Sequence, residues 1–189
     1  MADTLPISSV SGGVVMHPTI DGCIQLRNEH NLTADTIDHI ELKVHPLVMQ
    51  LTSRRSPQTG LEGKFSIYHA ASIAIVEGAG GVDQFSDRAV RDRAVASLRD
   101  RVTTAVDSSL HEDQVRIVVT MKNGGRLEKF IEHAVGSLEH PMSDKDLEAK
   151  FAGLVTGVLS ADRQGKLMDV CWNIEKLPQA GAIASAAIA

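Results

Sequence analysis

The stretch of residues 60–81 places four side chains that can give or accept protons at the start of a largely apolar run: Lys64, Ser66, Tyr68 and His69. An apolar run that only filled a core would not need four such groups at one end. Residues three or four apart are neighbours on a helix, so Lys64 lies beside Tyr68, while His69 belongs to the adjacent row. The pattern indicates a helix with a site at one end, although the four groups need not converge.

Two interpretations of this cluster are open. In the structural one, Lys64 snorkels to solvent, Ser66 contributes to a helix cap and His69 is hydrogen-bonded in the interior. In the functional one, His69 is a base or hydrogen-bond donor at the mouth of a buried helix. The same choice applies to His17, which precedes an earlier amphipathic helix and could equally act as a cap.

Hydrophobic periodicity predicts the elements that position these groups. Alternation predicts strands through residues 40–44, 102–106, 115–121 and 126–132, with the last two joined by a turn at Asn123-Gly124-Gly125. Helical spacing predicts helices that begin near His17, Lys64, Ser86 or Asp87, Ser143 and Leu167. The helix from about Lys64 to Glu77 is apolar nearly all round, so we expect it to be central.

These elements predict an α+β domain: an antiparallel sheet of about four strands with helices packed on one face. Residues 1–16 read as an irregular leader, residues 17–177 as the α+β domain, and residues 178–189 as a small-residue tail that is frayed or docks on a partner.

Composition narrows the class of function. The chain has 189 residues, a net charge of −5 and a pI near 5.9, which argues against nucleic acid or a membrane surface as partner. We expect the two cysteines, Cys23 and Cys171, to be free buried thiols of a cytoplasmic protein. Scattered histidines predict no metal site, and the absence of GxGxxG and of a P-loop predicts no nucleotide. We therefore expect no cofactor.

Four segments, in order, resemble the MmgE/PrpD family, which includes 2-methylcitrate dehydratase, cis-aconitate decarboxylase and iminodisuccinate epimerase. They are HPTIDGCIQLRNEHNLTADTIDHIELKV, TGLEGKFSIYHAASIAIVEG, FSDRAVRDRAVASLRDRV and HPMSDKDLEAKF. The resemblance runs from His17 to about Leu177 and covers only the C-terminal domain of the family. It implies dehydration, decarboxylation or epimerisation of small di- or tricarboxylates.

Carried over residue by residue, the resemblance makes His17 and His69 the catalytic candidates. It makes Lys64 and Ser66 substrate-binding candidates, with Arg54 or Arg55 as carboxylate contacts. Such chemistry needs cations, a tunable base and groups that hold developing negative charge.

The sequence departs from the family pattern in ways that leave the enzyme status open. The Lys-x-Tyr-Pro-x-Cys/His segment is absent, its lysine position falling near Ser8 and its last position near Gly13. The loop PLVMQLTSRR lacks the tyrosine of decarboxylase-like members. We therefore expect a C-terminal portion that is incomplete without a separate helical-domain subunit, and we expect a homo-oligomer, such as a dimer. The alternative is a non-catalytic remnant that binds a carboxylate or a partner.

Overall fold

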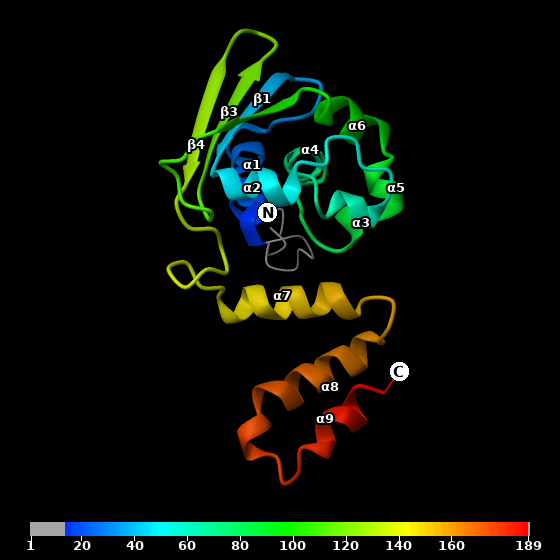
Figure 1. Cartoon of the computed structure of the whole chain (residues 1–189). Coiled ribbons are helices and arrows are strands. Elements are labelled where there is room, and N and C mark those ends of the chain that lie inside the picture. Colours follow the sequence, from blue (N-terminus) through cyan, green and yellow to red (C-terminus); the bar gives the residue numbers. More distant parts are fainter. Residues whose placement is uncertain (1–13, 189) are drawn as a thin grey trace. The chain divides into compact units, whose positions relative to one another are not determined.

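A computed structural model of the protein describes residues 14–188 (Figure 1). The sequence positions Ser8 and Gly13, and most of the predicted leader, lie outside the described residues. The chain divides into two compact units, the first ending at Met142 and the second beginning at Ser143.

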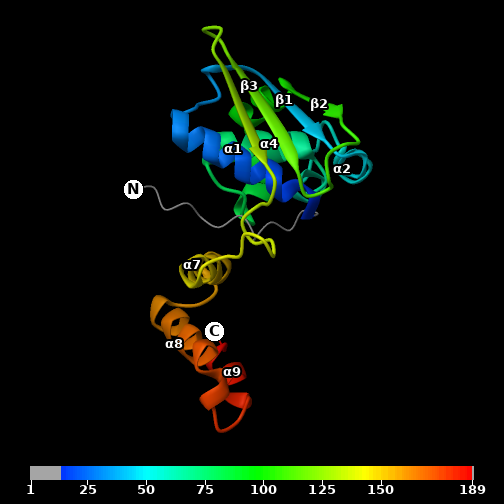
Figure 2. The same ribbon diagram turned by 90° about the vertical axis from the view of Figure 1, so that its left-hand side faces the viewer.

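The first unit is built on a four-stranded sheet in the order β2-β1-β3-β4. Figure 2 shows β3, β1 and β2 side by side. The four predicted strands are all confirmed, as is the turn at Asn123-Gly124, where Gly124 has a φ of +86°. The strands are β1 (Ile37–Val44), β2 (Val102–Val106), β3 (Val115–Met121) and β4 (Arg126–Ile131).

The prediction of an antiparallel sheet is wrong for one pair of strands. β1 pairs with β3, and β3 with β4, in antiparallel fashion, but β1 and β2 run parallel in the register Leu42 to Thr104. The physical reason is the connection: a series of helices lies between β1 and β2, and a helical crossover returns the chain in the same direction. The sheet is therefore mixed, within an α+β fold.

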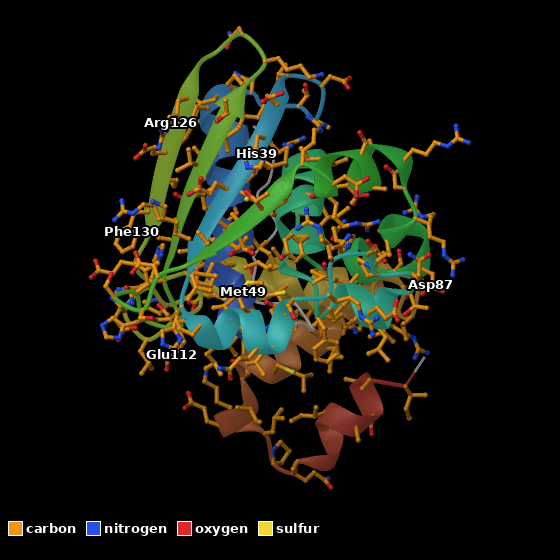
Figure 3. The ribbon with its side chains drawn as sticks, turned by 45° about the horizontal axis from the view of Figure 1, so that its top comes forward. His39, Met49, Asp87, Glu112, Arg126 and Phe130 are labelled. Atoms are coloured by element: carbon orange, nitrogen blue, oxygen red, sulfur yellow. The ribbon has the colours of Figure 1, made fainter. Side chains whose placement is uncertain are left out.

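Helices cover one face of this sheet, as predicted. α1 (His17–His30) packs beside α4 (Ile67–Glu77); α1 contacts β3 and β4, and α4 contacts β2. On β1 the residues facing these helices are buried, whereas the alternate residues are partly exposed on the outer face. Figure 3 labels His39 on β1 and Phe130 on β4, which belong to that outer face.

α4 is the central helix that its sequence predicted, since all nine residues from Ile67 to Ile75 are buried. Its start differs from the prediction. The helix begins at Ile67 rather than Lys64, because Ser66 adopts an extended conformation and its Oγ accepts a hydrogen bond from the His69 N–H at 3.1 Å. Lys64 instead ends a separate turn of helix, α3 (Gly60–Gly63).

The remaining helices of the first unit are short. The helix predicted to start near Ser86 is two helices, because Asp92 has an extended backbone and its carboxylate accepts from the N–H groups of Ala94 and Val95. The short elements are η2 (Val14–Met16), α2 (Pro46–Thr52), η3 (Asp83–Phe85), α5 (Asp87–Val90) and α6 (Arg93–Arg99).

The second unit consists of helices only. α7 begins with the predicted capping box of Ser143 and Asp146, and none of its residues is buried. Cys171 is exposed, which corrects the prediction of a buried thiol: this unit is a thin helical hairpin without a deep core. Its elements are α7 (Asp144–Val155), α8 (Ala161–Trp172), η4 (Ile174–Lys176) and, within the predicted tail, α9 (Gly181–Ala186).

Candidate functional site

The start of α4 is brought next to the end of α2 by a short backbone pairing. Ser53 and Ser66 form an antiparallel bridge, and the Arg54 N–H donates to the carbonyl oxygen of Phe65 at 3.2 Å. Residues far apart in the sequence therefore share one end of α4. This pairing places Arg54 and Arg55 beside Ser66.

The two arginines at this end have different partners. Arg54 lies 3.4 Å from a carboxylate oxygen of Glu62, in an ion pair whose arginine side chain is 55% exposed. Arg55 lies over the ring of Tyr68, with its guanidinium carbon 4.8 Å from the ring centroid. Stacking on an aromatic face leaves the edge of a guanidinium open to an anion. Arg55 is therefore better placed than Arg54 to bind a substrate carboxylate.

Lys64 completes a group of three cations, which we call the cationic surface (Arg54, Arg55 and Lys64). Lys64 is partly buried at the end of α3, and its backbone N–H donates to Gly60 and Leu61. Ser66 is fully buried and its hydroxyl is engaged in the helix cap. The cationic surface can attract an acid, whereas Ser66 holds the helix start on which the surface rests.

His69 lies in the first turn of α4 and has no exposed surface. Its Nε2 is 2.8 Å from the carbonyl oxygen of Gln84, so Nε2 carries the hydrogen. Its Nδ1 is buried without a hydrogen-bond partner within residues 14–188. Burial lowers the pKa of His69 from 6.5 to about 4, and the positive charge of Arg99 adds to the shift. His69 is therefore neutral at physiological pH.

Three short elements cover His69. Its ring meets the Phe85 ring edge to face, with centroids 5.3 Å apart. A Cβ at Gly63 would lie 3.2 Å from Cδ2 of His69 and 2.8 Å from Cγ2 of Val90. Since η3, α3 and α5 close over the imidazole, a direct proton transfer by His69 requires that this cover move.

His17 lies apart from the other predicted residues, at the start of α1. It lines a small pocket of about 60 Å³ with Pro18, Asp113 and residues 134–137. Ligand pockets are typically roughly 300–1,000 Å³, so this one has room for only part of a small acid. The structure thus gathers Arg54, Arg55, Lys64, Ser66 and His69 at one end of α4, and gives His17 a separate pocket.

The sequence did not single out Asp113, which lines the pocket with His17, or His133, which contacts Asp113. Nδ1 of His133 lies 3.5 Å from a carboxylate oxygen of Asp113 and 3.7 Å from one of Glu139. The signal was present in the hairpin: Val115 pairs with Ile131, and the same register two residues further on sets Asp113 opposite His133. A predicted turn at Asn123-Gly124 therefore already implied this pair.

Comparison with known protein families places most of the chain in one of them. A family model described as the MmgE/PrpD C-terminal domain matches residues 11–174. No curated protein matches the chain. The matched range includes every candidate residue discussed above. Across residues 14–188, no helix has both the length and the apolar character needed to cross a membrane.

Proposed function

Since the chain belongs to the MmgE/PrpD family, by a match to the family's C-terminal domain over residues 11–174, we propose that it is the C-terminal portion of a lyase or isomerase acting on small di- or tricarboxylates. The reaction proceeds by proton abstraction and elimination, and it needs a helical domain to complete the site. The family match is the observation that carries the proposal.

The cationic surface supports the binding half of this function. Arg55 stacks on Tyr68 and forms no ion pair with a carboxylate of residues 14–188, and Lys64 is a partly exposed cation two residues before Ser66. Arg54 contributes when Glu62 releases it, since their contact is long and solvent-exposed. Two or three cations on one surface suit a substrate with two or three carboxylates.

In this proposal the two histidines have different roles. His17 lines a small pocket of its own and is the acid–base candidate of this chain. His69 is neutral and covered, and it supports the start of α4 beneath the cationic surface. A direct catalytic role for His69 would add to this scheme only after the cover formed by η3 opens.

A thermal-melt experiment tests the binding half. At constant ionic strength, citrate at ten times its Kd should stabilise the folded wild type by about 1.4 kcal/mol. We expect its melting temperature to rise accordingly. Arg55→Ala should lose this response. Arg88→Ala is the matched control, because Arg88 is an exposed arginine on α5 and is not part of the cationic surface. Equal responses of the two variants, or no response of the wild type, would contradict the binding proposal.

A mixing experiment tests turnover. The chain is combined with a helical domain of the same family, and loss of water from a 2-hydroxytricarboxylate is followed by absorbance of the new double bond. We expect turnover only in the mixture, because a site open to water weakens each charge interaction.

The alternative function is carboxylate binding without turnover. It is favoured by one observation, namely that His69 is both fully buried and held neutral. Citrate stabilisation that persists while the mixture stays inactive would select this alternative.

A further inference from the structure

A second group of titratable side chains surrounds the pocket at the start of α1. His17 lines this pocket from α1, Asp113 lines it from the segment before β3, and residues 134–137 close it. Figure 3 marks this corner by Glu112, the residue before Asp113. The two titratable side chains that line the pocket are thus an imidazole and a carboxylate from different elements.

On its other side, Asp113 lies near His133. Nδ1 of His133 lies 3.5 Å from Oδ2 of Asp113, and the same nitrogen lies 3.7 Å from Oε2 of Glu139. These contacts join the segment before β3 to the segment after β4. Asp113 therefore lies between His133 and the pocket that contains His17.

The wall of the pocket is fixed independently of these ion pairs. Asp21 is 3% exposed, and its Oδ2 accepts a hydrogen bond from the Val135 N–H at 3.1 Å. Oδ1 of Asp21 accepts from Nε2 of Gln25 at 2.8 Å. The Gly136 N–H donates to the carbonyl oxygen of His140 at 2.7 Å. The segment that faces His17 is therefore a hydrogen-bonded turn tied to α1.

The charges around the pocket are mostly negative. Asp113 precedes β3, His133 and Glu139 follow β4, and Asp21 lies one turn along α1 from His17. Within the described part of the chain, no group of three or more His, Cys, Asp or Glu side chains is placed to hold a metal ion. The arrangement instead resembles the carboxylate–imidazole pairs in which a negative charge favours the imidazolium.

We propose that Asp113 is a positioning residue for His17. Its carboxylate lines the same pocket as His17 and favours the protonated form of His17, which then serves as the proton donor to a leaving group. The role of His17 as a proton donor rests on the proposed function, since elimination needs an acid as well as a base. The effect on protonation itself is independent of any substrate.

An NMR titration of the whole chain tests the inference. The Hε1 signal of His17, assigned by its loss in His17→Gln, is followed against pH in the wild type, Asp113→Asn and Glu112→Gln. We expect the pH of half-protonation to fall by roughly 0.5 unit in Asp113→Asn, a modest shift because these side chains are partly exposed. Glu112→Gln is the charge-matched control in the same segment and should change it little. Asp113→Glu should restore the wild-type value.

An unchanged titration in Asp113→Asn, or an equal change in Glu112→Gln, would overturn the inference. Asp113 is 46% exposed, so we expect the variants to fold, and Asp113→Ser removes the same charge if the asparagine variant does not. The citrate melts fail or succeed independently of this readout. If citrate does not stabilise the chain, the proposed substrate class is contradicted but the effect of Asp113 on His17 is not. If the titration of His17 does not change in Asp113→Asn, the role of Asp113 is contradicted but the proposed function is not.

Discussion

The imidazole of His69 and the backbone of Gln84 are joined by a partly buried hydrogen bond of 2.8 Å between Nε2 and the carbonyl oxygen. This bond connects the start of α4 to η3, the turn that covers it. The other ring nitrogen has no partner within the described residues. His69 is thus a buried neutral donor that fastens the cover over α4, and its loss should be visible in stability.

His69→Phe should lower the free energy of unfolding by about 1–3 kcal/mol, because phenylalanine leaves the partly buried carbonyl of Gln84 without this donor. Urea unfolding at pH 7.5 measures the change. His39→Phe is the control, since His39 is partly exposed on the outer face of the sheet, where its Nε2 lies 2.7 Å from the Thr103 hydroxyl. If both variants keep the wild-type stability, the bond to Gln84 is not holding the cover in place.

Gly60→Ala should destabilise the first unit, because the added Cβ would overlap the carbonyl oxygen of Phe85. The neighbour is backbone, so η3 and α5 would have to move, at a cost of about 1–3 kcal/mol. Gly153→Ala is the matched control: a Cβ there meets nothing within 4 Å, and it should stabilise α7 by about 0.5–1 kcal/mol. Thermal melts that rank the two variants in the opposite order would show that the cover is not tightly packed.

Ser143→Ala should weaken α7, because it removes both the bond from the Asp146 N–H to the Ser143 hydroxyl and the fixed partner of Asp146. We expect a loss of about 1 kcal/mol in local stability, measured by hydrogen exchange at residues 147–150. The chain offers a close control in Ser160, which precedes α8 and makes no side-chain cap. Ser160→Ala should leave exchange in α8 unchanged, and similar effects of both variants would argue against capping as the cause.

Local signals predicted much of this fold. The alternation in β1 and β3, the Asn123-Gly124 turn and the Ser143 cap are each set by a few neighbouring residues, and each is present in the structure. The direction of β2 was not predictable in the same way. Its residues alternate between apolar and polar whether the strand is parallel or antiparallel to β1, so the pattern does not distinguish the two. The packing of the crossover helices against the sheet makes it parallel to β1.

For the candidate site, too, local sequence predicted some features, whereas others depend on residues distant in sequence. The cluster at the start of α4 was found from its spacing, but the burial of His69 depends on Phe85 and Gly63, which are distant in sequence or carry no chemistry of their own. Periodicity predicts that Lys64 lies inside the helix. It does not reveal that Ser66 is extended and caps the helix, so that the helix starts after Lys64. The roles assigned to these residues stay predictions.

The pKa of His69 sets a specific pH dependence for stability. Burial holds this pKa at about 4 in the folded chain, against 6.5 for an ordinary histidine. Above pH 6.5 the imidazole is neutral in both states, and its contribution to stability is fully present. As the pH falls from 6.5 towards 4, the unfolded chain takes up a proton that the folded chain does not, so the free energy of unfolding falls.

The titration of His69 can be isolated by a comparison of variants. Between pH 7.5 and pH 5 the wild type should lose about 2 kcal/mol more stability than His69→Gln, in which this group no longer titrates. His39→Gln keeps His69 and should follow the wild-type profile. Urea unfolding at both pH values and constant ionic strength provides the measurement. Parallel profiles for the wild type and His69→Gln would mean that the imidazole takes up its proton in the folded state near pH 6.5. In that case the cover must open readily, which would return His69 to the group of side chains that a substrate can reach.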